Sequence, residues 1–455
     1  MPRSDRPCRR REARRDDLTD LHARPTRVRY AIIALIFLIT SVNYADRATF
    51  SIAGSAAARE LALTPVQTGF ILSAFAWAYV LAQIPGGVLL DRFGTKRVYA
   101  AAILLWSLFT ATQGFAGWII GIPVVAMLFA LRFLVGLAEA PSFPGNARLV
   151  AAWFPAAERG TASAIFNSAQ YFSLVAFAPL MGWLAHNYGW RSIFWTMGVL
   201  GVLATLAFVR FIHSPANHPR INAAELAHIE AGGGLVGMED SAASKAPAFA
   251  WRNVRHLIAN RMMLGIYLGQ YCINVLTYFF VTWFPIYLIK ERGLNVLEAG
   301  FAAAAPALFG FAGGLAGGFI SDRILKRTGS LDWARKTPLV VGMLLASMII
   351  ACVWAPSEWL VVALMSVAFF GKGIASLGWA IMADVAPRRL AGLSGGVFNM
   401  FGNIAGIVTP IVVGYIVAAT GSFDLALIFV GAHCLLTIFA FLVIAGPIRR
   451  MELPE

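Results

Sequence analysis

The segment YAIIALIFLITSVNYADRATFSI, residues 30–52, is a continuous apolar run that contains an aspartate and an arginine side by side. About 20 apolar residues are what a helix needs to cross the hydrocarbon core of a bilayer. Asp46 and Arg47 are each costly at that depth, by about 3 kcal/mol or more. The run therefore predicts a membrane-spanning helix that lines a polar cavity in which a charged species is handled.

The composition of the whole chain is typical of a membrane protein. Of its 455 residues, 59% are hydrophobic and 13% are charged, whereas soluble domains carry about 25% charged residues. Apolar windows predict twelve spans, at residues 30–52, 66–90, 98–118, 120–145, 160–185, 191–212, 262–288, 297–321, 337–355, 359–383, 391–417 and 423–447.

The polar stretch 213–261 is the one long interior segment that could not span a bilayer, and we interpret it as a cytoplasmic linker. It separates two predicted six-helix bundles, 30–212 and 262–447. Within it, NAAELAHIEAGGG predicts a short amphipathic helix ended by glycine. The leader 1–29 has no apolar stretch and is expected to be a disordered, basic cytoplasmic segment. Residues 448–455 form a predicted cytoplasmic tail.

The lysines and arginines are distributed very unevenly over this topology. Thirty of the 37 lie in segments at one side of the predicted membrane, and four lie at the other: Arg59, Arg191, Lys290 and Arg292. Basic residues concentrate in cytoplasmic segments of membrane proteins. The distribution predicts that both termini are cytoplasmic, and it accounts for the net charge of +14 without nucleic acid. Three cations remain inside spans: Arg47, Arg132 and Lys372.

A loop motif occurs once in each half of the chain. GGVLLDRFGTKR follows the second predicted span, and GGFISDRILKRTG follows the eighth. Both place a glycine pair four residues before Asp-Arg and a basic cluster, so we expect a gating role for Gly87, Asp91, Arg92, Gly94, Asp322 and Arg323. The motif resembles the loop signature of the major facilitator superfamily, and its recurrence suits two duplicated halves.

Further stretches resemble the anion:cation symporter branch of that superfamily. They are NYADRATFSIAG (43–54), SAFAWAYVLAQIPGG (73–87), RFLVGLAEAPSFPGNARLVAAWFP (132–155), FNSAQYF (166–172), GQYCINVLTYFFVTWFP (269–285), FFGKGIASLGWAIMADVAP (369–387) and GLSGGVFNMFGNIAGIVTP (392–410). The match is closest to bacterial proton-coupled permeases for D-glucarate and galactarate. The resemblance implies an all-α membrane protein in which two pseudo-symmetric six-helix bundles surround a central site with alternating access.

The adjacent pair in the first span suits coupled binding of a proton and an anion. Arg47 stays charged and offers a planar fork of donors to a carboxylate. Asp46 could neutralise Arg47 in the empty site, and protonation of Asp46 would free Arg47 for substrate. Alternatively the two form a permanent structural pair, although adjacent helix residues point about 100° apart. The resemblance implies that Asp46 carries the proton and that Arg47 holds the carboxylate.

Three further intramembrane charges are candidates for the same site. Arg132 and Glu139 lie seven residues apart, on one face of the fourth span. Glu139 is a second candidate proton-binding group, tuned by Arg132; the alternative is a structural network. Lys372 in the tenth span either snorkels to the membrane surface or, with Arg47, clamps the two carboxylates of a sugar diacid.

Polar and aromatic side chains in the spans could contact the hydroxyls and C–H faces of a sugar acid. Six match substrate-contacting positions of the sugar-acid branch: Tyr44, Tyr79, Gln170, Ser376, Trp379 and Asn399. Asn274 and Tyr278, four residues apart in the seventh span, are candidates by position alone. For each of them, the alternative is a hydrogen bond between helices.

These features predict a monomeric, multi-pass transporter of a bacterial inner membrane that imports sugar diacids with protons. A symporter of monoacid sugars (galactonate or a hexuronate) and a membrane sensor of sugar acids remain alternatives. An enzyme is not expected, because the spans contain no nucleophile–base or metal cluster, and no cofactor or nucleic-acid partner is implied. An organic-phosphate antiporter would want an arginine in the seventh span, where 264–288 has none.

Overall fold

The computed structural model describes residues 24–119, 121–155, 158–237, 251–387 and 391–452. Their regular structure is helical. Ten helical segments within them are long and apolar enough to cross a membrane. Part of the leader, of the linker and of the tail falls outside the described residues, so the bounds expected for these segments remain predictions.

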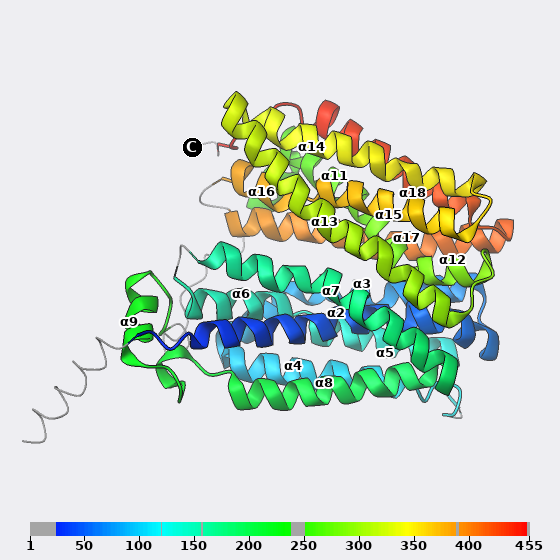
Figure 1. Cartoon of the computed structure of the whole chain (residues 1–455), viewed down its shortest axis with the longest axis horizontal. Helices are drawn as coiled ribbons and strands as arrows, with labels where there is room; N and C mark the ends of the chain where they lie inside the picture. The colour runs from blue at the N-terminus through cyan, green and yellow to red at the C-terminus, as the bar shows by residue number, and fades with distance from the viewer. Residues whose placement is uncertain (1–23, 120, 156–157, 238–250, 388–390, 453–455) are drawn as a thin grey trace, which may run out of the picture.

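The first half of the chain forms one bundle, drawn from blue to green in the lower part of Figure 1. Its helices overlap the predicted spans. They are α2 (Val28–Glu60), α3 (Pro65–Phe93), α4 (Thr95–Gln113), α5 (Val124–Glu139), α6 (Ser142–Trp153), α7 (Arg159–Tyr188) and α8 (Arg191–Phe211). Helices α2 and α6 run past the predicted ends at residues 52 and 145, to Glu60 and Trp153.

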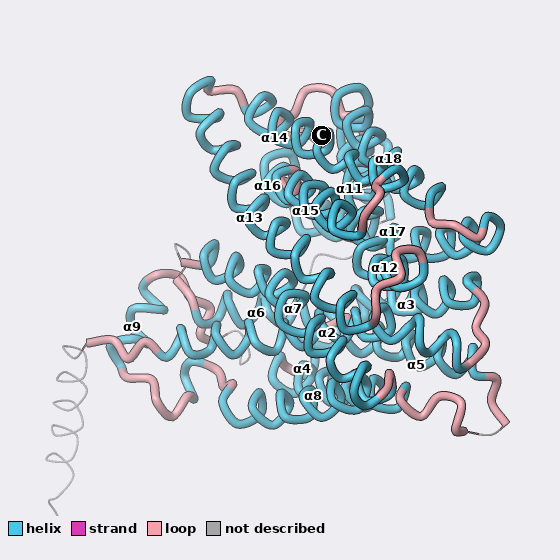
Figure 2. The backbone as a smooth tube through the Cα atoms, turned by 45° about the vertical axis from the view of Figure 1, so that its right-hand side comes forward, coloured by secondary structure: helices cyan, strands magenta, loops and turns pink. Residues whose placement is uncertain are grey.

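The second half forms the upper bundle, and Figure 2 shows it lying across the first. Its elements are α11 (Arg261–Thr282), α12 (Phe284–Lys290), α13 (Val296–Thr328), α14 (Leu331–Ala346), η2 (Ser347–Trp354), α15 (Glu358–Ile374), α16 (Gly378–Val385), α17 (Ala391–Thr420), α18 (Asp424–Phe439) and η4 (Ala440–Ile444).

Two long helices, α4 and α7, are not among the ten candidate spans. Polar residues such as Asn167 and Gln170 lower the hydropathy of α7, and Lys96 and Arg97 lie in the first turn of α4. Both helices nevertheless pack lengthwise inside the lower bundle, α7 against α2 and α4 against α8. They occupy the places of the predicted third and fifth spans.

Several predicted spans are broken helices. The fourth breaks between Glu139 and Ser142, at Pro141, and the seventh breaks at Trp283, just before Pro285. Proline disrupts a helix because it lacks an N–H and its ring clashes with the preceding turn. The tenth span breaks at residues 375–377, where no proline is present, so its break was not expected from the sequence.

The close approaches between the two bundles lie toward one end of the molecule, where α2 ends and α13 begins. Ser51 of α2 donates to the carbonyl of Thr282 at 2.7 Å. A Cβ at Gly300 of α13 would lie 2.7 Å from the carbonyl oxygen of Ala178 in α7. We call this the closed end, and we call the other end, where α2 begins and α8 ends, the basic end.

The linker contributes two short helices, α9 (Ala223–Ala231) and α10 (Trp251–Ala259), and α9 lies at the basic end in Figure 1. The predicted short helix ended by glycine is confirmed, because Gly232 is the C-cap of α9. Glu225 of α9 is fully buried, and Arg29 reaches it at 3.1 Å. Helix α9 of the linker is therefore bonded to the start of α2.

Candidate functional site

A cluster of buried charges lies between α2 and α5. Arg47 Nε donates to Glu139 Oε2 at 3.0 Å, and the two side chains are 13% and 0% exposed. Arg47 also donates through Nη2 to Oδ1 of Asn43, one turn earlier on α2, at 3.2 Å. The break after Glu139 ends α5 at this depth and leaves the carboxylate facing α2. Arg47 and Glu139 thus form an ion pair that joins two helices.

Asp46 does not take part in this ion pair. It is 2% exposed, and among the described residues neither of its carboxylate oxygens has a hydrogen-bond partner. The indole of Trp106 lies near it without completing a hydrogen bond. The expected neutralisation of Arg47 by Asp46 is replaced by the pair with Glu139, because neighbouring residues of one helix point about 100° apart.

Arg132 fastens three helices together at the cluster. Its Nε donates to the carbonyl of Ile71 in α3 at 3.0 Å, and its Nη2 donates to the carbonyl of Arg47 at 3.4 Å. No carboxylate of the described residues lies within ion-pair distance of Arg132. Its charge acts on Glu139 and Asp46 through space rather than through a direct bond.

Aromatic rings surround the guanidinium of Arg47. Its Cζ lies 4.8 Å from the ring centres of Tyr44 and Tyr79 and 4.7 Å from that of Phe75. Cations over aromatic faces are stabilised by the ring quadrupole. Both tyrosines were predicted from the sequence. Phe75, which lies four residues before Tyr79 and stacks on its ring, was not.

Lys372 is the buried cation of the other bundle. It is 6% exposed, and no carboxylate among the described residues lies within ion-pair distance of it. Its Nζ lies 5.9 Å from the ring centre of Tyr171, which belongs to α7 of the first bundle. Tyr171 was missed, although its neighbour Gln170, which is half-buried, was predicted. An unpaired buried ammonium is costly, so Lys372 is available for an anion.

Side chains of α11 and α17 lie on the side of the upper bundle that faces Arg47. The Tyr278 hydroxyl donates to Oδ1 of Asn403 at 2.7 Å, and it lies within electrostatic range of Arg47. Asn403 in turn donates to Oδ1 of Asn399 at 3.2 Å. Asn274 is half-buried on the same helix as Tyr278. Asn403 was not predicted, although it lies four residues after Asn399 and therefore on the same face of α17.

Ser376 lies within the break between α15 and α16, and Trp379 lies in the first turn of α16. The Ser376 hydroxyl donates to the carbonyl of Lys372 at 2.8 Å, so it fixes the turn that carries the lysine. Trp379 is 59% exposed and lies edge-on against Phe398. The structure brings Ser376 next to Lys372, and it leaves the indole of Trp379 uncovered.

The repeated loop motif takes different forms in the two bundles. Gly94 has φ +84° and both ends α3 and begins α4, a conformation that favours glycine. The side chain of Asp91 lies outside the described residues. Asp322 and Arg323 are exposed at the end of α13, as Arg92 is at the end of α3, and Gly87 has open space beside it.

The second bundle has a charge network that the motif did not predict. Arg335 of α14 donates to Oδ2 of Asp384 and to Oγ of Ser321, each at 2.8 Å. Asp322, for which a gating role was predicted, takes no part in this network. Its neighbour Ser321 is buried and faces Arg335 instead, since residues one apart on a helix face different directions.

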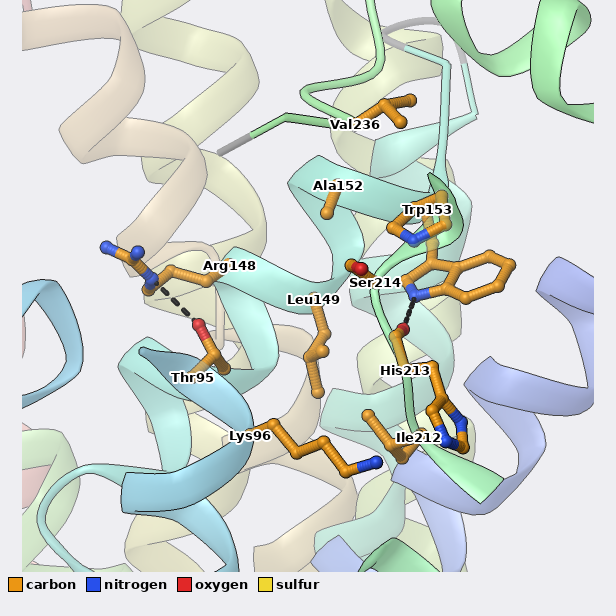
Figure 3. A pocket seen from close by; sticks show the side chains of 11 residues that line it. Thr95, Lys96, Arg148, Leu149, Ala152, Trp153, Ile212, His213, Ser214 and Val236 are labelled. Carbon is orange, nitrogen blue, oxygen red and sulfur yellow. Dashed lines mark hydrogen bonds between the residues drawn. The ribbon is translucent and has the colours of Figure 1, made fainter. Parts of the chain in front are cut away.

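A separate small pocket lies at the basic end of the lower bundle (Figure 3). Arg148 Nε donates to Oγ1 of Thr95 at 3.0 Å, and Trp153 Nε1 donates to the carbonyl of His213 at 3.1 Å. These bonds join α4, α6 and the segment after α8. The pocket is apart from the buried charge cluster and from Lys372.

Comparisons with known proteins agree with one another. A family model described as Major Facilitator Superfamily matches residues 36–331. The chain is 56% identical over 430 residues to "Probable galactarate/D-glucarate transporter GudP" of Escherichia coli K12, covering 94% of this chain and 96% of that protein. The protein of the same name from Bacillus subtilis 168 is 55% identical, with 94% of each chain covered.

A solved structure shares the fold at low sequence identity. It is a bacterial homolog of the human lysosomal transporter Spinster in an inward-facing, unoccupied conformation. The TM-score is 0.68 at 18% identity, and the match covers 92% of this chain and 96% of that one. The arrangement of the two bundles is therefore shared with a transporter.

Proposed function

Because the chain belongs to the Major Facilitator Superfamily of membrane transporters, we propose that it imports a sugar diacid of the D-glucarate and galactarate type together with protons. The relatives that are more than half identical to it carry galactarate and D-glucarate in their names. The single observation that carries the proposal is the pair of buried cations, Arg47 and Lys372, one in each bundle.

The two cations suit a substrate that is anionic at both ends. Arg47 can present a fork of donors to one carboxylate, and Lys372 can bind the other without displacing a protein carboxylate. Tyr44, Tyr79 and Tyr278 lie around Arg47, and Tyr171 lies beside Lys372. These phenols, with Gln170, Asn274, Ser376, Trp379 and Asn399, are the proposed partners of the sugar hydroxyls.

Proton coupling follows from competition for Arg47. A substrate carboxylate can bind the guanidinium of Arg47 only if the ion pair with Glu139 breaks. A proton on Glu139 removes the negative charge that stabilises this ion pair. Asp46 is buried and no hydrogen bond from a described residue stabilises its charge, so a proton there relieves the cost of burying it. We assign Asp46 and Glu139 as the proton-binding groups, with Arg132 as the fixed charge that tunes both.

Transport then requires the bundles to rock about the site. The basic end carries the cytoplasmic loops and both termini in the bacterial inner membrane, and the closed end faces outward. The motif residues Gly87, Asp91, Arg92, Gly94, Asp322 and Arg323 would govern opening at the basic end. The chain needs no second copy to complete this site, so we propose a monomer.

Counterflow tests this function. Proteoliposomes loaded with unlabelled glucarate should accumulate labelled glucarate transiently, because exchange across the membrane needs a carrier and no energy source. Galactarate should compete at similar concentrations, whereas galactonate and glucuronate should compete at least tenfold less well. Absence of exchange would point to a sensor, and preferential competition by galactonate or glucuronate would point to a transporter of monoacids.

A further inference from the structure

A groove of about 450 Å³ opens on the lower bundle at the basic end, where α2 begins and α8 ends. Its rim is basic, with Arg27, Arg210 and Arg220, and its wall is apolar, with Ala31, Leu35 and Phe211. Ligand pockets commonly measure about 300–1,000 Å³. None of these six residues belongs to the proposed transport site.

The three rim arginines are available to bind an anion. They come from three separate segments, ahead of α2, in the last turn of α8 and ahead of α9, and all three are exposed. Within the described ranges, no carboxylate lies at ion-pair distance from any of them. Burial and the neighbouring His213 lower the pKa of His218, which also lines the groove. At neutral pH the charge of the rim is therefore that of the arginines.

The position of Arg27 is fixed by the linker. Its φ of +48° lies in the left-handed region, which a residue other than glycine adopts only where the surroundings impose it. Glu225 of α9 imposes it here, accepting from the backbone N–H of Val28 at 2.8 Å and of Arg29 at 3.2 Å. The side chain of Arg27 lines the groove.

The apolar wall runs along the helix axis, away from the arginines. Ala31 and Leu35 lie four residues apart in the first turns of α2, which places them on one face of that helix. Phe211 closes the other side from the end of α8 and is 46% exposed. A ligand in the groove would have its charge at the helix ends and its apolar part at membrane depth.

We propose that this groove binds one anionic phospholipid. Its phosphate would lie between Arg27 and Arg210, with Arg220 above it, and an acyl chain would follow Leu35 and Phe211. Charge complementarity selects an anionic headgroup. The apolar wall selects a lipid over a soluble anion, because free phosphate would leave Leu35 and Phe211 without an apolar partner. Because Arg220 belongs to the linker and Arg27 precedes α2, the lipid would also hold the linker against the start of α2.

Native mass spectrometry of the purified full chain, titrated with phosphatidylglycerol or phosphatidylcholine, tests the proposal. We expect one phosphatidylglycerol to be retained in preference to phosphatidylcholine. Arg27→Gln/Arg210→Gln should weaken that binding about thirtyfold, and Arg27→Lys/Arg210→Lys should restore most of it. The matched control is Arg252→Gln/Arg255→Gln, which removes two exposed arginines from α10 and should leave the single high-affinity lipid in place.

Three other outcomes would contradict the proposed lipid site. Equal losses in the groove and control variants would mean diffuse attraction to a basic surface. Equal retention of both lipids would mean that charge does not select the ligand. Displacement of phosphatidylglycerol by millimolar inorganic phosphate would mean a site for a free anion. Recovery of binding in the lysine variant would show that the loss in the glutamine variant does not come from misfolding. A lysine variant that folds and does not recover binding would contradict the proposal.

Discussion

Arg47 Nε and Glu139 Oε2 lie 3.0 Å apart, although the residues are 92 positions apart in the chain and belong to different helices. The ion pair occupies the guanidinium fork that a substrate carboxylate would need. In the proposed mechanism the substrate carboxylate therefore competes with the Glu139 carboxylate for Arg47, and protonation of Glu139 favours substrate binding. The first prediction follows from this competition.

Glu139→Gln should uncouple substrate binding from protonation at this position. The amide keeps the shape and loses the charge, so Arg47 is released permanently. We expect counterflow of glucarate to persist, with an apparent affinity that changes less between pH 6 and pH 8 than that of the wild type, because only Asp46 can still take up a proton. Concentrative uptake should fall at least tenfold. Glu230→Gln, on the exposed face of α9, is the control. A variant that remains as pH-dependent as the wild type would contradict the competition.

Lys372→Asn should discriminate between diacids and monoacids. The second carboxylate of glucarate loses a charge-assisted hydrogen bond, which amounts to a roughly 10- to 100-fold weaker apparent affinity. Galactonate, with one carboxylate, should lose much less. Lys326→Asn, at the exposed end of α13, serves as control. Equal losses for the two substrates, measured by competition against labelled glucarate, would remove Lys372 from the anion clamp.

Gly300→Val should hinder closure of the outward end. A side chain there meets the carbonyl of Ala178 and the backbone of Gly182, and overpacking of this kind costs about 1–3 kcal/mol. We expect initial uptake to fall roughly 10- to 100-fold at equal amounts of protein in the membrane. Gly396→Val on α17, where a Cβ has open space, should transport normally. Similar activity of the two variants would show that this contact does not limit the cycle.

Two carboxyl groups in the site make an electroneutral cycle the simplest stoichiometry. A dianion that enters with two protons moves no net charge, so the membrane potential, worth about 2.3 kcal/mol per charge per 100 mV, does no work on it. Glucarate should then evoke little current in proteoliposomes, while an imposed pH gradient should drive uptake. A large inward positive current would require a third proton and a further proton-binding group.

The spans could be predicted from sequence because the bilayer imposes a length and a composition on every crossing helix. The prediction for residues 191–212 differs from α8 by one residue at its end. The interruption at residues 375–377 could not be predicted, because no proline marks it. It depends on packing that brings Gly378 against Gln270 and Phe398, which is a tertiary property.

The charged residues of the candidate site could be identified from the sequence, whereas the partners that they contact could not. Buried charges are costly wherever they occur, so Asp46, Arg47, Glu139 and Lys372 stood out by residue type alone. Which carboxylate meets Arg47 depends on how α5 ends beside α2, and the sequence contains no local signal for that. Tyr171 was missed for a similar reason, since its importance comes from a lysine in the other bundle.

The assignment of Asp46 as a proton carrier can be tested most directly in proteoliposomes with an imposed pH gradient, inside alkaline. Wild-type protein should concentrate labelled glucarate against its gradient. Asp46→Asn should fail to concentrate it and should still exchange labelled for unlabelled glucarate in counterflow. Accumulation by Asp46→Asn at the level of the wild type would contradict the central claim that this buried, unpaired carboxyl couples the proton to the sugar diacid.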